Sequence, residues 1–448
     1  MSTFSRRKFL TTAGLSTVSA IALNACGGGG ETPKADSTAT TKASPSASAT
    51  TTPKVSAADT PETTKAKLGF IALTDASPLI IAKEKGLFEK YGMKDVEVLK
   101  QASWGTTRDN IVLGSDAGGI DGAHILTPMP YLISEGKVTN GNKVPMYILA
   151  RLNTNGQAIS IANEFKDLKI ALKSDSLKES FAKIKSGGKE VKCAVTFPGG
   201  THDLWMRYWL AANGVDPNND VNTIVVPPPQ MVANMKAGNM QAFCVGEPWN
   251  ARLIAQNSGY SALITGELWK DHPEKAFSLR ADWVDKNPKA AKALLMAVLE
   301  AQMWCEKPEN KEEMCKIVGA DKWFKVPAIE ILGRQQGKVD YGDGRTIDNP
   351  DLAMKFWKDN ASYPYKSHDL WFITEDMRWG YFDADTDAKK LVDKVNREDL
   401  WKEAAKAIGQ EAAIPKSTSR GIETFFDGVK FDPENPSEYL KNLKIKKA

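Results

Sequence analysis

Short apolar runs alternate with amphipathic segments through the first two-thirds of the chain, beginning near residue 68. The runs that predict strands cover residues 68–73, 96–99, 120–126, 146–152, 168–172, 193–197, 223–226 and 241–245. Most of the segments between them have a helical period. The first follows Ser77 and Pro78, an N-cap residue and a proline suited to the first turn. Strands that alternate with helices predict an α/β fold with mostly parallel sheets covered by helices.

The pattern changes after about residue 287, where long helical segments dominate. The first of these covers residues 288–305, and short aromatic-rich loops such as residues 363–368 separate the later ones. A chain of 448 residues is too long for one ordinary core, so we expect two lobes or more. We place a first lobe at residues 66–160, a second at residues 161–265, and a return to the first lobe with C-terminal helices at residues 266–448.

The first 26 residues are typical of an export signal rather than of folded structure. Residues 5–10, with Arg6 and Arg7, resemble a twin-arginine signal, and a modest apolar run follows up to residue 23. The run ends in Leu-Asn-Ala-Cys, which resembles a bacterial lipobox with Cys26 as the lipid attachment residue. The alternative is an ordinary cleaved signal with a chance cysteine.

Residues 27–65 form a polar segment that opens with four glycines and continues mainly in Ser, Thr, Ala, Pro and Lys. Such a composition cannot bury enough apolar surface to fold, so we expect a flexible tether. A tether of this length reaches roughly 35 Å. Together with the lipobox, it predicts a receptor that is lipid-anchored on the periplasmic side of the inner membrane.

Charge and cysteine content exclude several classes of protein. The net charge of +4 is small for this length and predicts no nucleic-acid partner. The body holds four cysteines at spacings that match no zinc or redox motif, so neither a metal nor a cofactor is expected. We expect buried free thiols, with a disulfide between Cys305 and Cys315 as the alternative.

Four strings carry a resemblance to a known family. They are QASWGTTRDN at residues 101–110, PGGTHD at 198–203, VGEPW at 245–249 and RGIETFFDG at 420–428. With them the chain resembles the nitrate-binding proteins of cyanobacterial nitrate/nitrite ABC transporters from about residue 66 to its end. The resemblance implies a two-lobed periplasmic-binding-protein fold of the second type with a helical C-terminal extension. It also implies a ligand gripped between the lobes, and a permease and an ATPase as partners.

Five residues match the nitrate contacts of that family: Trp104, Gln157, His202, Gly246 and Lys275. Nitrate is a planar monoanion with three acceptor oxygens and no proton to donate. An indole N–H, an amide, an imidazole N–H, a backbone N–H and an ammonium would together supply donors and one positive charge. Charge-assisted hydrogen bonds in a cleft closed against water are the strong ones.

Each of the five has a plainer interpretation. By pattern, Gln157 follows a turn after a strand, His202 lies in the first turn of a helix that follows a strand, and Gly246 lies at another strand-to-helix junction. The plainer interpretations are packing for the tryptophan, a surface loop for the glutamine, helix capping for the histidine, a turn for the glycine and a solvated charge for the lysine. Lys270 is a second lysine close in sequence, which we expect at the surface. The neighbouring acids Asp203, Glu247 and Glu274 are expected to cap a helix, order a loop or face solvent, because an acceptor aimed at nitrate would repel it.

Three other functions compete with nitrate binding. The sister family binds bicarbonate and shares most of the four strings; its pattern, by resemblance, has a glutamate at position 275 and a glutamine at position 202. An enzyme is not supported, because the chain has no Gly-x-Ser-x-Gly, no clustered metal ligands and no glycine-rich phosphate loop. A cytoplasmic sensor with the same fold conflicts with the export signal and the tether.

Overall fold

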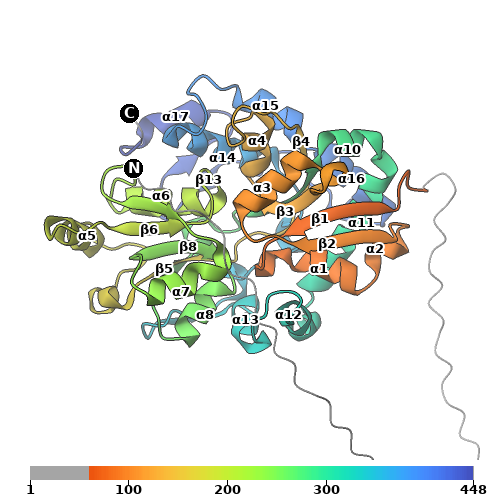
Figure 1. Cartoon of the computed structure of the whole chain (residues 1–448). Coiled ribbons are helices and arrows are strands. Elements are labelled where there is room, and N and C mark those ends of the chain that lie inside the picture. Colours follow the sequence, from red (N-terminus) through yellow and green to blue (C-terminus); the bar gives the residue numbers. More distant parts are fainter. Residues whose placement is uncertain (1–59, 447–448) are drawn as a thin grey trace, which may run out of the picture. The chain divides into compact units, whose positions relative to one another are not determined.

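The computed structural model describes residues 60–446, so the export signal, Cys26 and most of the expected tether lie outside the described residues. The described part of the chain contains two five-stranded sheets and two small hairpins (Figure 1). The strand order is β2-β1-β3-β10-β4 in the first sheet and β7-β6-β8-β5-β9 in the second. This two-sheet α/β architecture confirms the predicted fold class.

The first sheet combines parallel and antiparallel pairs. Strand β1 is parallel to β2 and β3, whereas β10 is antiparallel to β3 and β4. Its strands are β1 (Lys65–Phe70), β2 (Asp95–Lys100), β3 (Gly122–Leu126), β4 (Met146–Arg151) and β10 (Lys275–Arg280).

The second sheet repeats this plan. Strand β6 is parallel to β7 and β8, whereas β5 is antiparallel to β8 and β9. Its strands are β5 (Gln157–Ile161), β6 (Lys192–Val195), β7 (Asn222–Val225), β8 (Ala242–Gly246) and β9 (Tyr260–Ile264). In each sheet four strands run in the same direction and one, β10 or β5, runs against them. The expectation of mostly parallel sheets is confirmed by strand direction, but it did not include this antiparallel strand. The chain enters each sheet from the other lobe, at the edge where the parallel strands end. The strand that it then forms, β5 or β10, therefore runs antiparallel to its neighbours.

Seven of the eight predicted strands overlap observed ones. The strand predicted at residues 168–172 is wrong: the 3-10 helix η4 (Asn163–Leu168) ends there, and Lys169 follows with a left-handed φ of 50°. Strands β5, β9 and β10 were not predicted. The expected lobe boundary at residue 160 falls inside β5, whose pairing partners both belong to the second sheet.

Helices cover both sheets, and the predicted helices after Ser77 and over residues 288–305 are confirmed. Around the first sheet lie α1 (Ser77–Glu84), α2 (Leu87–Lys90), α3 (Trp104–Leu113), α4 (Met129–Ser134), α10 (Ala281–Lys286) and α11 (Pro288–Glu306). Around the second lie α5 (Ser176–Ser186), α6 (Thr201–Ala212), α7 (Met231–Lys236), α8 (Trp249–Ala255) and α9 (Thr265–Leu268).

The C-terminal third contacts elements of both lobes. Helices α12 and α16 pack on α1 and β4 of the first lobe, whereas α13 and α14 contact α8 and α6 of the second (Figure 1). The elements are α12 (Lys311–Gly319), α13 (Ala328–Gln335), α14 (Lys366–Trp379), α15 (Ala388–Val395), α16 (Glu398–Ala407), α17 (Pro436–Asn442), and the hairpin strands β11 (Lys338–Asp340), β12 (Thr346–Asp348), β13 (Glu423–Thr424) and β14 (Lys430–Phe431).

The four cysteines of the body are buried free thiols, as expected. Burial raises the pKa of the Cys193 thiol to about 12, so it is protonated at neutral pH. Between residues 60 and 446, no helix combines the length and the hydropathy that a membrane span requires.

Candidate functional site

Two stretches of chain connect the sheets, and each ends on a residue of the predicted site. Residues 152–156 lead from β4 to β5, which begins at Gln157; residues 265–274 lead from β9 to β10, which begins at Lys275. Because β5 and β10 run against their parallel neighbours, their first residues lie at the carboxyl edge of those neighbours. Ligands of open α/β sheets bind at this edge.

The other three predicted residues lie at the same junctions. Gly246 is the last residue of β8 and is directly paired with Gln157 of β5. Trp104 is the first residue of α3, which Ser103 caps by accepting from the backbone N–H of Thr106 at 3.1 Å. His202 is the second residue of α6, in the first turn, where we expected it. The structure therefore brings all five together, in a place where their side chains are buried.

Hydrogen-bond donors from both lobes converge on one atom, the side-chain oxygen of Gln157. His202 Nε2 lies 2.8 Å from Gln157 Oε1, and Lys275 Nζ lies 3.4 Å from the same oxygen. The amide oxygen can only accept, so His202 carries its proton on Nε2. Its Nδ1 then accepts from the hydroxyl of Thr196, at 2.5 Å. His202 comes from the second lobe and Lys275 from the first, so the site requires both.

Gly246 makes this convergence possible. A Cβ atom at this position would lie 2.5 Å from Gln157 Oε1 and 3.3 Å from Asp75 Oδ2, so only glycine leaves room for the oxygen. Trp104 lies on the opposite lobe, with the Lys275 ammonium 6.0 Å from its ring centroid. Its indole Nε1 is buried and has no hydrogen-bond partner among residues 60–446.

Asp75 belongs to this cluster although sequence reasoning missed it. It lies in the 3-10 helix η2 (Thr74–Ala76) after β1 and is fully buried. Its carboxylate accepts from Lys275 Nζ at 2.9 Å and from Gln157 Nε2 at 3.1 Å, and lies 2.6 Å from His124 Nε2. Burial alone would raise the pKa of the Asp75 carboxyl, but Lys275 and His124 outweigh it and hold the pKa well below its usual range.

Glu274 is the second carboxylate in contact with the lysine. It accepts from Lys275 Nζ at 2.7 Å, from Trp205 Nε1 at 2.6 Å and from the Thr201 hydroxyl. Burial raises the pKa of Glu274, with Lys275 opposing the shift. The expectation that this acid faces solvent is wrong, because it is fully buried and orients Lys275. We call Asp75, Gln157, His202, Glu274 and Lys275 the buried cluster.

The histidine and the lysine of the cluster differ in charge. Burial, followed by the nearby Lys275 charge, lowers the pKa of His202 well below its usual range, so the imidazole is neutral. Burial also disfavours the Lys275 ammonium, but Asp75 and Glu274 outweigh it and raise the pKa of the lysine. The cluster therefore offers an ammonium and a neutral imidazole N–H, and Trp104 beside it offers an indole N–H. These groups bind acceptor oxygens.

The two lobes also touch beside the cluster through backbone contacts. The backbone N–H of Thr74 donates to the carbonyl of Glu247 at 2.7 Å, and Trp249 Nε1 donates to the carbonyl of Ala72 at 2.9 Å. Ala72 and Thr74 belong to the first lobe, Glu247 and Trp249 to the second. The structure is thus a closed arrangement in which the site is sealed on this side.

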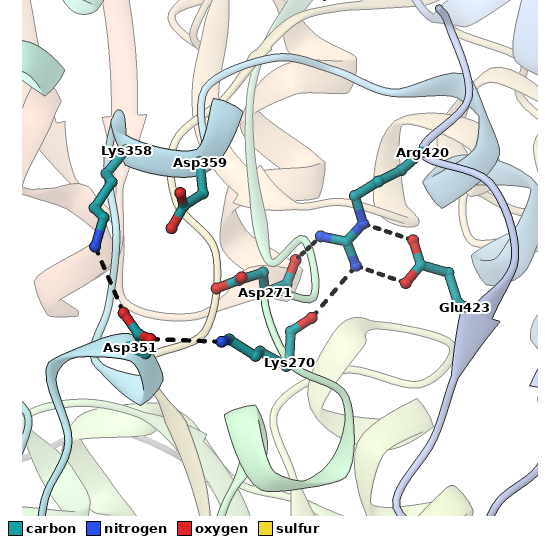
Figure 2. A pocket seen from close by; sticks show the side chains of 7 residues that line it. All are labelled: Lys270, Asp271, Asp351, Lys358, Asp359, Arg420 and Glu423. Carbon is teal, nitrogen blue, oxygen red and sulfur yellow. Dashed lines mark hydrogen bonds and ion pairs between the residues drawn. The ribbon is translucent and has the colours of Figure 1, made fainter.

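Lys270 takes no part in the buried cluster. Its side chain is 57% exposed and its ammonium lies 3.6 Å from Asp351. It lines a surface cavity of about 510 Å³ together with six other charged residues (Figure 2). We call this the surface cavity, and its lining residues are Lys270, Asp271, Asp351, Lys358, Asp359, Arg420 and Glu423. Among residues 60–446, no three His, Cys, Asp or Glu side chains are grouped to hold a metal ion.

The chain is similar to binding proteins of known specificity over its whole length. It is 62% identical to the nitrate/nitrite binding protein NrtA of Synechococcus elongatus, covering 100% of this chain and 99% of that protein. It is 44% identical to the bicarbonate-binding protein CmpA of the same organism, covering 99% and 98%. The nitrate import ATP-binding protein NrtC of Synechocystis is 32% identical over 84% of this chain and 55% of its own length.

A solved structure and a family model agree with these relatives. The crystal structure of the periplasmic nitrate-binding protein NrtA from Synechocystis PCC 6803 matches with a TM-score of 0.85 and 65% identity, over 86% of this chain and 100% of that chain. Residues 59–319 match the model of the NMT1-like family. The nitrate/nitrite binding proteins that match over their full length are solute-binding components, which confirms the prediction that the protein is not an enzyme. The chain therefore belongs to the NMT1-like family and to the family of nitrate/nitrite binding proteins that NrtA represents.

Proposed function

We propose that the protein is the solute-binding subunit of an ABC importer and that it captures nitrate, and with it nitrite, between its two lobes. The observation that carries the proposal is the convergence of His202 and Lys275, from opposite lobes, on the oxygen of Gln157. An anion oxygen in reach of the same donors would hold the lobes together. Ligand contacts to both lobes favour the closed state over the open one.

The five predicted residues suit a planar monoanion. Lys275 supplies the charge, His202 and Trp104 supply N–H donors, and Gln157 can turn its amide N–H₂ toward the ligand. Gly246 leaves space beside Gln157 and Asp75 for a small ion, because no side chain projects from it.

Bicarbonate is the alternative ligand. It carries a proton and requires an acceptor, but both carboxylates near the site, Asp75 and Glu274, are already engaged by several donors. Positions 202 and 275 hold a histidine and a lysine rather than the glutamine and glutamate that the sister pattern implies. The higher identity to the nitrate/nitrite binding protein than to the bicarbonate-binding protein also supports nitrate.

The partners and the location follow from the transport role. The similarity to the nitrate import ATP-binding protein supports a permease and an ATPase of an ABC importer as the partners. The periplasmic NrtA structure supports a location outside the inner membrane. We propose that a lipid on Cys26 anchors the protein. The tether of residues 27–65 then gives the two lobes the reach to dock on the permease.

Calorimetry of the purified protein with nitrate, nitrite and bicarbonate, each with and without calcium, tests the ligand. We expect one nitrate per chain, weaker or equal binding of nitrite, and no bicarbonate binding at concentrations that saturate nitrate. Tight bicarbonate binding without nitrate binding would refute the nitrate assignment and leave the transport role standing.

Fractionation of cells that carry Cys26→Ser tests the anchor. We expect the variant to leave the membrane fraction and to bind nitrate with unchanged affinity, since residue 26 is far in sequence from the site residues. A variant that still sediments with membranes after a salt wash would contradict lipid attachment at this residue.

A further inference from the structure

His124 is a buried histidine beside the site that the five predicted contacts do not include. It lies within β3, directly opposite Phe277 of β10, so the two side chains point to the same face of the sheet. Lys275 comes two residues before Phe277 on β10 and therefore shares this face. His124 Nε2 is 2.6 Å from the carboxylate of Asp75. Because that carboxyl is ionised, Nε2 carries the proton, and Nδ1 of the neutral ring is left with a lone pair.

That second nitrogen is unpaired. Among residues 60–446, His124 Nδ1 has no hydrogen-bond partner, although the side chain is fully buried. The neighbouring ring has the same property: Trp104, whose centroid lies 5.4 Å from that of His124, has an unpartnered Nε1. Leaving a buried polar atom unpaired costs free energy, so two such atoms on adjacent rings beside the buried cluster point to a partner that the described residues do not supply.

The charges around these rings are unfavourable for a monoanion. Asp75 and Glu274 are carboxylates, each held by three hydrogen-bond donors, and within residues 60–446 Lys275 is the one ammonium that contacts them. The sum is one negative charge before any ligand binds. A nitrate ion would raise it to two in a fully buried place, where unbalanced charge is strongly disfavoured. A proton taken up with the anion removes this excess.

We propose that His124 is a sixth anion-binding residue, which takes up one proton from solvent at Nδ1 as the anion binds and donates it in a charged hydrogen bond to an anion oxygen. The proposal rests on the nitrate-binding function proposed above. In this step a neutral imidazole, one proton and the anion combine to form an imidazolium–anion pair. No bond in the ligand is broken.

The charged and titratable groups around His124 favour it over its neighbours as the proton acceptor. They are Asp75 after β1, Lys275 on β10 and His202 on α6. Asp75 already accepts from Nε2 and stabilises an imidazolium. His202 has both nitrogens engaged, by Thr196 and Gln157. If Glu274 took up the proton instead, it would lose the hydrogen bond from one of its three donors.

The direction of the pH dependence follows from these contacts. Burial, with Lys275 adding to it and Asp75 opposing it, lowers the pKa of His124 in the ligand-free protein, so the ring is neutral at pH 7. An anion against Nδ1 raises that pKa. Binding therefore takes up a proton, and affinity rises as pH falls through the pKa of the complex. The affinity levels off once the pH is below the pKa of His124 in the ligand-free protein.

Calorimetry of the full chain with nitrate at pH 7, in phosphate and in Tris, measures the proton uptake, because the two buffers differ in ionisation enthalpy. We expect close to one proton per nitrate, and a Kd that falls by about tenfold for each unit by which pH is lowered within the linked range. His124→Gln keeps a donor toward Asp75 but cannot be protonated. It should abolish the uptake and weaken nitrate binding by about ten- to a hundredfold, with a Kd independent of pH.

His368→Gln is the matched control. The chain has four histidines, and His368 lies on α14 with its Nε2 3.5 Å from Glu423, so its replacement should leave proton uptake unchanged. Nitrogen-15 spectra of histidine in the unaltered protein give a second measurement: nitrate should convert His124 from one N–H to two at pH 7.

Two results would overturn the proposal while nitrate binding stands. One is nitrate binding with no proton uptake and no second N–H on His124. The other is an uptake that survives in His124→Gln and disappears in Glu274→Gln, which would move the proton to that carboxyl. If nitrate does not bind at all, the proposed function fails, and this inference fails with it.

Discussion

The buried cluster and the surface cavity contain the same kinds of side chains and lie at opposite ends of one short stretch of chain, residues 270–275. Lys275 in the cluster is fully buried, and its ammonium contacts Asp75 at 2.9 Å and Glu274 at 2.7 Å. Lys270 in the cavity is 57% exposed and reaches Asp351 at 3.6 Å (Figure 2). What separates a binding site from a charged surface here is water, since solvent screens the exposed pair and not the buried ones.

The partners of the two lysines differ in a second way. In the surface cavity the charges satisfy one another: Arg420 binds both oxygens of Glu423, and Asp351 lies between Lys270 and Lys358 (Figure 2). In the buried cluster, donors from both lobes point at a single oxygen of Gln157. An anion can compete for donors that converge, whereas it gains little among exposed pairs that are already neutral.

Removing the buried charge should have the largest effect. Lys275→Ala removes the permanent positive charge from a buried site, and we expect a loss of about 2–4 kcal/mol, or on the order of 30- to 1,000-fold in affinity. Lys275→Glu should be worse, because it adds repulsion. Combined with His202→Gln, it should shift preference toward bicarbonate. Calorimetry with both anions measures these changes.

Stability must be followed in the same variants. Lys275→Ala leaves Asp75 and Glu274 as buried carboxylates without a cation, a change that typically costs about 3–5 kcal/mol of unfolding free energy. Thermal unfolding shows the temperature range in which the variant is folded, and affinity is compared there. A folded Lys275→Ala protein with the affinity of the parent would refute the role of this lysine.

Adding a side chain at Gly246, beside the Gln157 oxygen, should have the next largest effect on nitrate affinity. A Cβ at Gly246 would lie 2.5 Å from Gln157 Oε1, so Gly246→Val forces the amide away from the converging donors. We expect a loss of about 1–3 kcal/mol in nitrate affinity, measured by calorimetry. Gly105→Ala is the control, since it lies next to Trp104 but its Cβ would meet only Ser103 Oγ at 3.6 Å. Equal losses in the two variants would contradict the argument.

Removing one neutral donor should have a smaller effect. Trp104→Phe keeps an aromatic ring but removes the unpaired indole N–H, so we expect nitrate affinity to fall by about 0.5–1.5 kcal/mol. Fluorescence titration should show that much of the nitrate-dependent change in tryptophan emission is lost as well. Trp304→Phe, a half-buried tryptophan beside Lys85, should alter neither property. Solution scattering that shows no compaction at saturating nitrate would refute closure of the lobes.

The sequence predicted much of this fold because parallel strands and long helices leave clear patterns. Gln157 shows where the prediction stopped. We placed it in a turn after a strand, but it begins β5, a short antiparallel strand whose apolar residues are too few to be told from a loop. Whether a short apolar run pairs with a distant strand depends on contacts across the whole chain, which local pattern does not record.

The site was only partly predictable for a similar reason. The five predicted residues were identified by resemblance, and physical reasoning added only that His202 and Gly246 lie at strand–helix junctions. Asp75 shares that signal, since it lies between β1 and α1, and could have been found. His124 could not, because it stands inside an apolar run and gains its polar partner from a segment 49 residues away. Glu274 was misjudged because exposure is the ordinary state of a glutamate.

Replacing Lys270 should change nitrate affinity least, and it tests whether the anion binds at the buried cluster or at the surface cavity. Lys270→Ala removes an exposed charge whose pair with Asp351 is screened by solvent, so nitrate affinity should change by less than about twofold. Any residual effect should come from long-range attraction and vanish as salt is raised to about 0.5 M, while the effect of Lys275→Ala persists because no solvent separates that lysine from the cluster. Suppose instead that Lys270→Ala weakens nitrate binding strongly at high salt and Lys275→Ala does not. The anion would then bind at the surface cavity, the buried cluster would only hold the lobes together, and the assignment of the five residues would be wrong.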